Sequence, residues 1–172
     1  MIKLSNEKGS NFLIKKVENE IHSSSFYCSN EEVNDFFYNL AKFNHDQLLS
    51  KVYIYYNPKN EEIIGFISLS AYRVNLPDTT KIPIQKVPSV LLGRLAIDNK
   101  YRGSNLGEDL IKYAIGICDE VKNLIGCRLL IVEVEKKDNK LLKYFLKKGF
   151  EKIHEGSQYH YIMIDLLESK ES

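Results

Sequence analysis

The chain has 172 residues, 44% hydrophobic and 27% charged, a composition typical of a single globular domain over residues 1–172 and not of a disordered or fibrous protein. Its 24 Lys and Arg nearly balance 23 Asp and Glu, and the net charge of +1 excludes a chain that is basic throughout. Three cysteines form no Cys-x-x-Cys pair, no apolar run approaches the ~18 residues of a membrane helix, and the start has no signal-peptide core. We therefore expect a cytoplasmic protein with reduced cysteines and no membrane contact.

The first predicted helix follows Ser29. The string Ser29-Asn30-Glu31-Glu32 has the pattern of a capping box, with Ser29 as the cap and Glu32 reaching back. Apolar residues then recur at helical spacing and predict its core face: Val33, Phe36, Phe37, Leu40 and Phe43.

Strand-forming residues dominate 51–56 and 63–72, and the turn residues 57–60 between them predict a hairpin. The segment 75–89 holds three of the four prolines and is expected to be a loop. Residues 90–97 form an almost continuous apolar run, which is typical of a strand buried on both faces.

The remaining elements alternate between helix and strand. We expect them at Asn105 to about Lys122 (helix), 129–135 (strand), 139–148 (helix), 150–154 (strand) and 159–166 (strand). This alternation predicts an α/β protein with a crossover connection in its sheet.

The segment after the strand at 90–97 is the most informative for ligand binding. A buried strand leads into a glycine-containing turn that opens a helix. Such a turn exposes several main-chain N–H groups at the positive end of the helix, which makes an anion site. Arg102 adds a cation beside them. The segment has neither the Gly-Lys-Ser/Thr of a Walker A loop nor a Gly-x-Gly-x-x-Gly pattern. These residues alone leave two interpretations open, a phosphate site and an ordinary strand-to-helix turn.

The pattern Arg102-x-x-Asn105-x-Gly107 resembles the Arg/Gln-x-x-Gly-x-Gly/Ala signature of the GNAT N-acetyltransferases. Four further strings extend the resemblance: Phe26 to Ser29, Ile64 to Ser70, Leu92 to Asp98 and Lys148 to Phe150. Together they make the chain most similar to the GNAT toxins of bacterial type II toxin–antitoxin systems, over residues from about 20 to 166. The resemblance implies the GNAT fold, a mixed twisted sheet of about six to seven strands flanked by helices. It also implies a V-shaped split between the strands at 90–97 and 129–135.

The resemblance implies acetyl-CoA as the co-substrate. The pantetheine arm is expected along Leu95, Ala96 and Ile97. The pyrophosphate is expected on the turn and the helix start: Arg102, Gly103, Ser104, Asn105, Leu106, Gly107 and Glu108. Asn105 replaces a glycine that is usual in the family, and Asn is the non-glycine residue that best tolerates the left-handed region, so the turn is expected to survive. The four histidines show no spacing typical of metal ligands, and no metal is expected.

The proton-transfer residues depart from the family. Many members carry a tyrosine, thought to protonate the departing CoA thiolate, four residues before the closing Gly-Phe; here that position is Phe145. Tyr144 is the candidate general acid if the helix register is shifted. One alternative is that Phe145 is a core residue and Tyr144 a half-exposed residue at the edge of the apolar face. Another is that the thiolate leaves without a proton from the protein, because the pKa of a free thiol is ~8.5.

The candidate general base is Glu133, with Glu135 as the alternative. Both carboxylates belong to the predicted strand at 129–135. The ordinary interpretation is that both are solvated carboxylates at a strand end, and it applies more to Glu135 than to Glu133. An α-amine, with a pKa of about 8, needs little base, whereas a lysine ε-amine at ~10.4 needs a stronger one. The absence of an obvious base therefore favours an α-amino substrate.

The predicted helix at 139–148 is rich in lysine. Lys140, Lys143 and Lys147 share one face, which is either a solvated helix face or a patch that follows the phosphates of a tRNA acceptor stem. Arg94 is either a residue that meets the acceptor end or a paired structural arginine.

The resemblance to the toxins implies acetylation of the α-amine of aminoacyl-tRNA, an antitoxin partner and, as is common in the family, a homodimer. Two alternatives remain open. One is a GNAT enzyme that acetylates a small-molecule amine or a protein N-terminus, because a fold does not determine a substrate. The other is a catalytically impaired CoA-binding module, suggested by Phe145.

Overall fold

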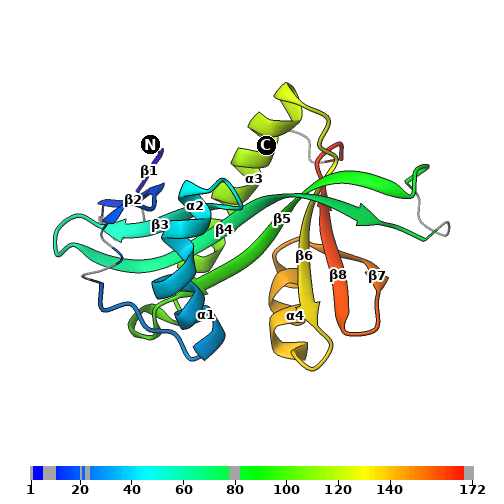
Figure 1. Cartoon of the computed structure of the whole chain (residues 1–172). Coiled ribbons are helices and arrows are strands. Elements are labelled where there is room, and N and C mark those ends of the chain that lie inside the picture. The colour runs from blue at the N-terminus through cyan, green and yellow to red at the C-terminus, as the bar shows by residue number, and fades with distance from the viewer. Residues whose placement is uncertain (1, 6–10, 20, 22–23, 78–81, 169–172) are drawn as a thin grey trace. The chain divides into compact units, whose positions relative to one another are not determined.

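The computed structural model describes residues 2–5, 11–19, 21, 24–77 and 82–168 (Figure 1). Within these residues eight strands form a sheet in the order β1-β2-β3-β4-β5-β6-β8-β7. The strands are β1 (Ile2–Ser5), β2 (Asn11–Lys16), β3 (Lys51–Asn57), β4 (Glu62–Asn75), β5 (Lys86–Ile97), β6 (Leu129–Glu135), β7 (Glu151–Glu155) and β8 (Tyr159–Asp165). The α-helices are α1 (Glu31–Asp35), α2 (Ala41–Asp46), α3 (Leu106–Leu124) and α4 (Asn139–Lys147). The predicted α/β class is confirmed. The eight described strands are one more than the upper end of the expected six to seven.

The chain divides into two compact units. The first comprises Met1–Ser70 and Arg94–Tyr113, and the second comprises Ala71–Gly93 and Ala114–Ser172.

The sheet is mixed, because β5 and β6 run parallel while β6 and β8 run antiparallel. The parallel register joins Ser89–Leu91 to Leu129–Ile131 and ends there, although β5 continues to Ile97 and β6 to Glu135. The described parallel pairing thus covers only the first part of each strand's length beyond Pro88 and Arg128, and the V-shaped split stays a prediction.

In the first unit, the helical segment begins one residue later than predicted. Asn30 is the cap, and its Oδ1 accepts a hydrogen bond from the Val33 N–H at 3.2 Å. The prediction of Ser29 as the cap is wrong, because the Ser29 hydroxyl donates instead to Asn99 Oδ1 at 3.1 Å. The side chain of Ser29 therefore contacts the turn after β5.

A π-helical turn, Phe36–Leu40, joins α1 to α2. The Ala41 N–H donates to the Phe36 carbonyl, five residues back, so this turn contains one residue more than an α-helical turn. Ala41 is consequently buried, whereas Leu40 is 45% and Phe43 57% exposed. The prediction that Leu40 and Phe43 lie on the core face is wrong for this reason.

In the second unit, a small core lies under the ends of β4 and β5. Val74, Leu76, Ile82 and Val87 are buried against β6. The expected loop over 75–89 is therefore shorter than predicted, because β4 extends to Asn75 and β5 begins at Lys86. Pro88 is compatible with this strand because its carbonyl accepts a hydrogen bond, from the Arg128 N–H at 2.8 Å.

The helix α3 is amphipathic. Leu106, Leu110, Ala114 and Cys118 recur at helical spacing and are all buried. Of the helices in the described part of the chain, none is both long and apolar enough to cross a membrane.

Candidate functional site

The turn between β5 and α3 has the backbone of an anion site. A short 3₁₀ turn, Asn99–Tyr101, is followed by the exposed residues Arg102 and Gly103. Gly103 has φ +79°, which a glycine adopts without strain. Asn105 is not among the described residues with positive φ, so the turn places its left-handed residue at Gly103 and makes no such demand on Asn105.

Five successive amides of this turn can bind an anion. In the described part of the chain, no acceptor pairs with the main-chain N–H groups of residues 103–107. The Glu108 N–H differs, because it donates to the Asn105 carbonyl at 2.9 Å, and the Glu108 carboxylate pairs with Lys112. Amides at the start of a long helix suit a phosphate or pyrophosphate. The amides of residues 103–107 are therefore available to an anion and that of Glu108 is not, and their assignment to the pyrophosphate of CoA stays a prediction.

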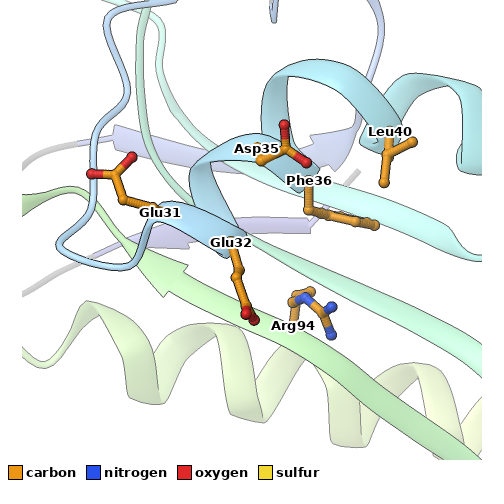
Figure 2. A pocket seen from close by; sticks show the side chains of 6 residues that line it. All are labelled: Glu31, Glu32, Asp35, Phe36, Leu40 and Arg94. Carbon is orange, nitrogen blue, oxygen red and sulfur yellow. The ribbon is translucent and has the colours of Figure 1, made fainter.

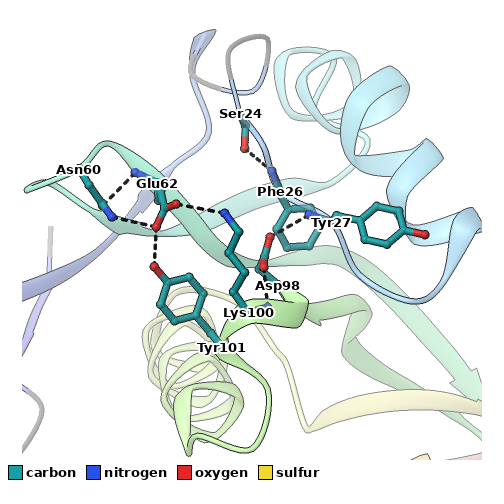
Figure 3. A network of polar contacts seen from close by, with 8 residues as sticks. All are labelled: Ser24, Phe26, Tyr27, Asn60, Glu62, Asp98, Lys100 and Tyr101. Atoms are coloured by element: carbon teal, nitrogen blue, oxygen red, sulfur yellow. Dashed lines mark hydrogen bonds and ion pairs between the residues drawn. The ribbon is translucent and has the colours of Figure 1, made fainter.

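A polar network holds this turn in place (Figure 3). Asp98 is buried, and its two oxygens accept from the Tyr27 N–H at 2.9 Å and the Lys100 N–H at 2.8 Å. Glu62 accepts from the Tyr101 hydroxyl and pairs with Lys100 Nζ at 3.2 Å. These two contacts, that of Tyr101 first, lower the pKa of Glu62. The turn is thus held before any ligand binds.

The end of β5, where the pantetheine arm is expected, packs tightly on β4. Ala96 is buried, and Leu95 and Ile97 are half-buried. A Cβ added at Gly65 would lie 2.5 Å from the Ala96 carbonyl oxygen and 2.6 Å from Ile97 Cδ1, so β4 requires glycine there. The backbones of β4 and β5 therefore approach closely at this point.

A cavity of about 490 Å³ lies in the first unit beside Arg94 (Figure 2). Its lining residues are Glu31, Glu32, Asp35, Phe36, Leu40 and Arg94. The guanidinium carbon of Arg94 lies 5.4 Å from the centre of the Phe36 ring, and Figure 2 shows the Glu32 carboxylate directed toward Arg94. Arg94 therefore has a structural contact with Phe36 and also lines this cavity, and its role at the acceptor end stays a prediction.

The three carboxylates of this cavity are functional candidates that the sequence prediction missed. The sequence pattern indicates a capping role for Glu32 and no role for Asp35. With one guanidinium among three carboxylates, the cavity favours a cationic group such as an ammonium.

In the second unit, the contacts of the two carboxylates of β6 differ. Glu133 Oε1 accepts a hydrogen bond from the Tyr72 hydroxyl at 2.7 Å. Glu135 instead pairs with Lys137 Nζ at 2.7 Å. Burial and then the bond to Glu133 raise the pKa of Tyr72. Glu133 is thus the carboxylate with a defined hydrogen-bonded orientation, and Tyr72 is a second residue that the sequence prediction missed.

The aromatic residues of α4 have distinct environments. Phe145 is 2% exposed and packs edge-on against Phe150, with ring centres 5.1 Å apart. Tyr144 is half-buried, contacts Phe145 at 5.5 Å, and lies 5.9 Å from Lys148 Nζ. Phe145 is therefore a core residue, and the role of Tyr144 as a proton donor stays a prediction.

The lysines of α4 face solvent. Lys140, Lys143 and Lys147, called the lysine row below, are exposed and form no ion pair with any described residue. The neighbouring Lys136 is different, because it pairs with Glu155 at 3.0 Å, and Lys152 and Lys136 together lower the pKa of Glu155 to about 2. The lysine row is therefore an exposed, uncompensated positive surface. Elsewhere in the described residues, no cluster of His, Cys, Asp or Glu is arranged to hold a metal ion.

Comparisons with known proteins support the same reaction class. Residues 15–150 match the model of the acetyltransferase (GNAT) family. A Mycobacterium tuberculosis protein named tRNA-acetylating toxin is 30% identical over 120 residues, which are 63% of this chain and 67% of the relative.

Solved structures of toxins share the fold. A Tyr-to-Phe variant of KacT has a TM-score of 0.79 and 26% identity, covering 91% of this chain and 95% of the other. AtaT complexed with acetyl-methionyl-tRNAfMet has a TM-score of 0.76 and 23% identity over 90% and 95% of the two chains. A Tyr-to-Phe variant of AtaT, bound to acetyl-CoA and the C-terminus of the antitoxin AtaR, has a TM-score of 0.75 and 22% identity over 91% and 94%.

These findings confirm the predicted fold class and the predicted enzyme class. The matched region contains the whole turn after β5 and the start of α3, where the signature residues lie. Acetyl-CoA is accordingly the co-substrate that the family uses. The chain belongs to the acetyltransferase (GNAT) family.

Proposed function

We propose that this enzyme transfers the acetyl group of acetyl-CoA to the α-amine of aminoacyl-tRNA and so acts as a toxin that blocks translation. The observation that carries the proposal is the Mycobacterium tuberculosis tRNA-acetylating toxin, which this chain matches at 30% identity over two thirds of that protein. An acetylated α-amine cannot form the next peptide bond, which is the basis of the toxicity.

For the co-substrate, we assign the pyrophosphate to the amides of Gly103, Ser104, Asn105, Leu106 and Gly107, with Arg102 as an additional cation. The support is that these five amides have no acceptor among the described residues, whereas the amide of Glu108 donates to the Asn105 carbonyl. Main-chain groups of Leu95, Ala96 and Ile97 would bind the pantetheine arm and polarise the thioester carbonyl. Catalysis then depends mainly on positioning the amine and the thioester together.

For proton transfer, we assign Glu133 as the base that accepts a proton from the acceptor ammonium. The hydrogen bond from Tyr72 supports Glu133 over Glu135, whose carboxylate is neutralised by Lys137. Tyr144 would donate a proton to the CoA thiolate, because Phe145 has none to give.

For the acceptor, we assign the lysine row to the phosphates of tRNA. Lys140, Lys143 and Lys147 are uncompensated by any described carboxylate, which is what a phosphate-binding surface requires. Arg94 would bind near the aminoacyl end. We also propose an antitoxin partner that covers this basic surface, in line with the AtaT complex with the C-terminus of AtaR. The homodimer stays a prediction.

The test is cell-free translation with purified protein, with and without acetyl-CoA, together with mass analysis of the charged tRNA. We expect translation arrest that requires acetyl-CoA and is relieved by fresh aminoacyl-tRNA, and an acetyl group on the α-amine. Unmodified charged tRNA, together with release of CoA when small amines are added, would contradict the tRNA assignment.

A small amine is a second candidate acceptor, favoured by one observation. The cavity beside Arg94 has three carboxylates and a volume of about 490 Å³, which suits a small cationic amine. Charge removal in the lysine row distinguishes the candidates. It would leave acetylation of a small amine unchanged and would weaken acetylation of tRNA in a salt-dependent way.

A further inference from the structure

Glu133 lies in a small cluster with two tyrosines of the second unit. Tyr72, from the end of β4, donates its hydroxyl proton to Glu133 Oε1 at 2.7 Å. Tyr161 is the cross-strand partner of Glu133 in the antiparallel pair β6–β8, so both side chains project from the same face. In the described part of the chain, Glu133 Oε2 accepts no hydrogen bond. One carboxylate oxygen is thus fixed, and the other is left to bind a ligand.

The two tyrosine rings are held by their surroundings. Both pack against the buried cluster of Val74, Leu129, Ile131 and their neighbours. Tyr161 also stacks on His154, with ring centres 5.8 Å apart. A Cβ at Gly156 would come within 3.0 Å of the Tyr161 ring, so the glycine leaves space for it. The hydroxyl of Tyr72 is consequently presented to Glu133 from a packed core, with little freedom to turn away.

The position of Glu133 along β6 matches a catalytic role. The pairing of β6 with β5 ends at Ile131, and Glu133 is the next residue on the same face of the strand. Its carboxylate therefore belongs to the part of β6 that lies beyond the described pairing with β5. Glu135, two residues further along, has its carboxylate neutralised by Lys137.

We propose that Tyr72 is a positioning residue that holds the Glu133 carboxylate in the orientation needed to deprotonate the acceptor amine. This inference rests on the proposed function, in which Glu133 is the base. The acceptor ammonium gives one proton to Glu133, its freed lone pair forms a bond to the thioester carbonyl carbon, and the carbon–sulfur bond breaks. The nitrogen then loses its second proton to give the amide and the CoA thiolate takes up one proton, so these two exchanges cancel. The sum is acetyl-CoA plus ammonium giving amide, CoA thiol and one proton, which Glu133 returns to solvent.

Tyr72 acts through Glu133 and does not serve as a base itself. Burial and the neighbouring carboxylate raise the pKa of its phenol, so that the hydroxyl stays protonated at neutral pH and can only donate. Its effect should therefore appear only when the acceptor is an ammonium that must be deprotonated before it attacks, and only when Glu133 is present.

The test compares Tyr72→Phe, Glu133→Gln and the double variant, using two acceptors with acetyl-CoA. Glycinamide is mostly protonated at pH 7, because the pKa of an α-amine is about 8, whereas methoxyamine is neutral there. For glycinamide we expect kcat/KM to fall about tenfold in Tyr72→Phe and about a hundredfold in Glu133→Gln. The double variant should be no slower than Glu133→Gln alone. For methoxyamine, Tyr72→Phe should retain the wild-type rate.

The matched control is Tyr159→Phe, since Tyr159 stands opposite Glu135 on the same two strands and should not affect either acceptor. Equal losses toward both acceptors in Tyr72→Phe, or a double variant that is slower by the product of the single effects, would overturn the positioning role. If Tyr72→Phe does not fold, Glu133→Gln tests the same carboxylate. Its activity should fall toward glycinamide and not toward methoxyamine, and equal losses of activity toward the two acceptors overturn the proposal.

The outcomes separate this inference from the proposed function. Wild-type protein that acetylates glycinamide but not aminoacyl-tRNA overturns the tRNA assignment and leaves the role of Tyr72 to be decided by the variants. Wild-type protein that acetylates none of these amines overturns both.

Discussion

The turn that is assigned to the co-substrate and the helix that is assigned to the acceptor are built in opposite ways. In the first unit, both oxygens of Asp98 are engaged and the Glu62 carboxylate contacts Asn60, Lys100 and Tyr101, so the turn is held by interlocking polar contacts. In the second unit, Phe145 is the one residue of α4 that is buried, and the lysine row has no ion pairs with described residues. The difference suggests that co-substrate binding is rigid and resists change, whereas the acceptor surface can change its charge at little structural cost.

The largest effect is expected from removing the buried aromatic ring of α4. Phe145→Ala should lower the free energy of unfolding by about 3–5 kcal/mol, because a ring packed against Phe150 is replaced by a cavity. Denaturant unfolding measures this. Leu146→Ala is the control, because Leu146 is exposed and should cost far less. Equal losses in the two variants would mean that α4 is not held by Phe145.

The next effect concerns catalysis by the same helix. Tyr144→Phe removes the proposed proton donor and should lower kcat by about a hundredfold, with little effect on stability because Tyr144 is half-buried. Single-turnover CoA release measures the step. A Phe145→Tyr variant that is faster than the wild type, combined with an unchanged Tyr144→Phe, would transfer the role to position 145.

A third change loosens the rigid turn. Asp98→Asn leaves one acceptor oxygen for two N–H donors, those of Tyr27 and Lys100, and should cost about 1–3 kcal/mol of unfolding free energy. The KM for acetyl-CoA should rise several-fold, because the amides that follow are less well oriented. The same substitution at the cap of α4, Asp138→Asn, is the control, since Asn also caps helices. A change in the KM for acetyl-CoA in both variants would argue against a local effect.

The lysine row allows a test of the surface of α4 that is assigned to the acceptor. Lys140→Gln with Lys143→Gln should raise the KM for aminoacyl-tRNA and leave that for acetyl-CoA unchanged. The slope of log affinity against log salt should fall by about one for each lysine that contacts a phosphate. The control pair is Lys59→Gln with Lys86→Gln, two exposed lysines elsewhere. Identical salt slopes in all proteins would contradict a phosphate contact.

The smallest effect is a pH dependence confined to the first unit. Burial, and secondarily Lys51, lower the pKa of His45, whose Nδ1 must be unprotonated to accept from the Val52 N–H at 3.0 Å. The stability that this provides is complete above the unfolded pKa of about 6.5 and is lost as the pH falls below it. His45→Asn should flatten the stability between pH 7 and pH 5. A stability curve as steep as that of the wild type would show that other groups are responsible.

Local patterns predict most of the helices and strands, because capping and periodicity act over a few residues. The helix predicted from Asn105 begins at Leu106 in the structure, and the expected hairpin is the pair β3–β4. Local patterns give no bounds for β1 and β2, because these strands are stabilised by pairing along the sheet, with β2 beside β3.

The site was predictable only where its residues are neighbours in the sequence. The signature from Arg102 to Gly107 indicates both the turn and its ligand. The contacts of Tyr72 with Glu133 and of Arg94 with Phe36 join separate strands and helices, so no local spacing reveals them.

The π-helical turn Phe36–Leu40 also bears on how this helix tolerates changes of length. The turn contains one residue more than an α-helical turn, and core residues lie on both sides of it at Phe36, Phe37 and Ala41. Deleting one residue between Phe37 and Ala41 would restore four-residue spacing from Phe36 to Ala41 and keep both core residues on the same face. An insertion or deletion elsewhere in the helix would rotate everything beyond it by about 100°. This turn is therefore the place where the helix can lose a residue without repacking its core.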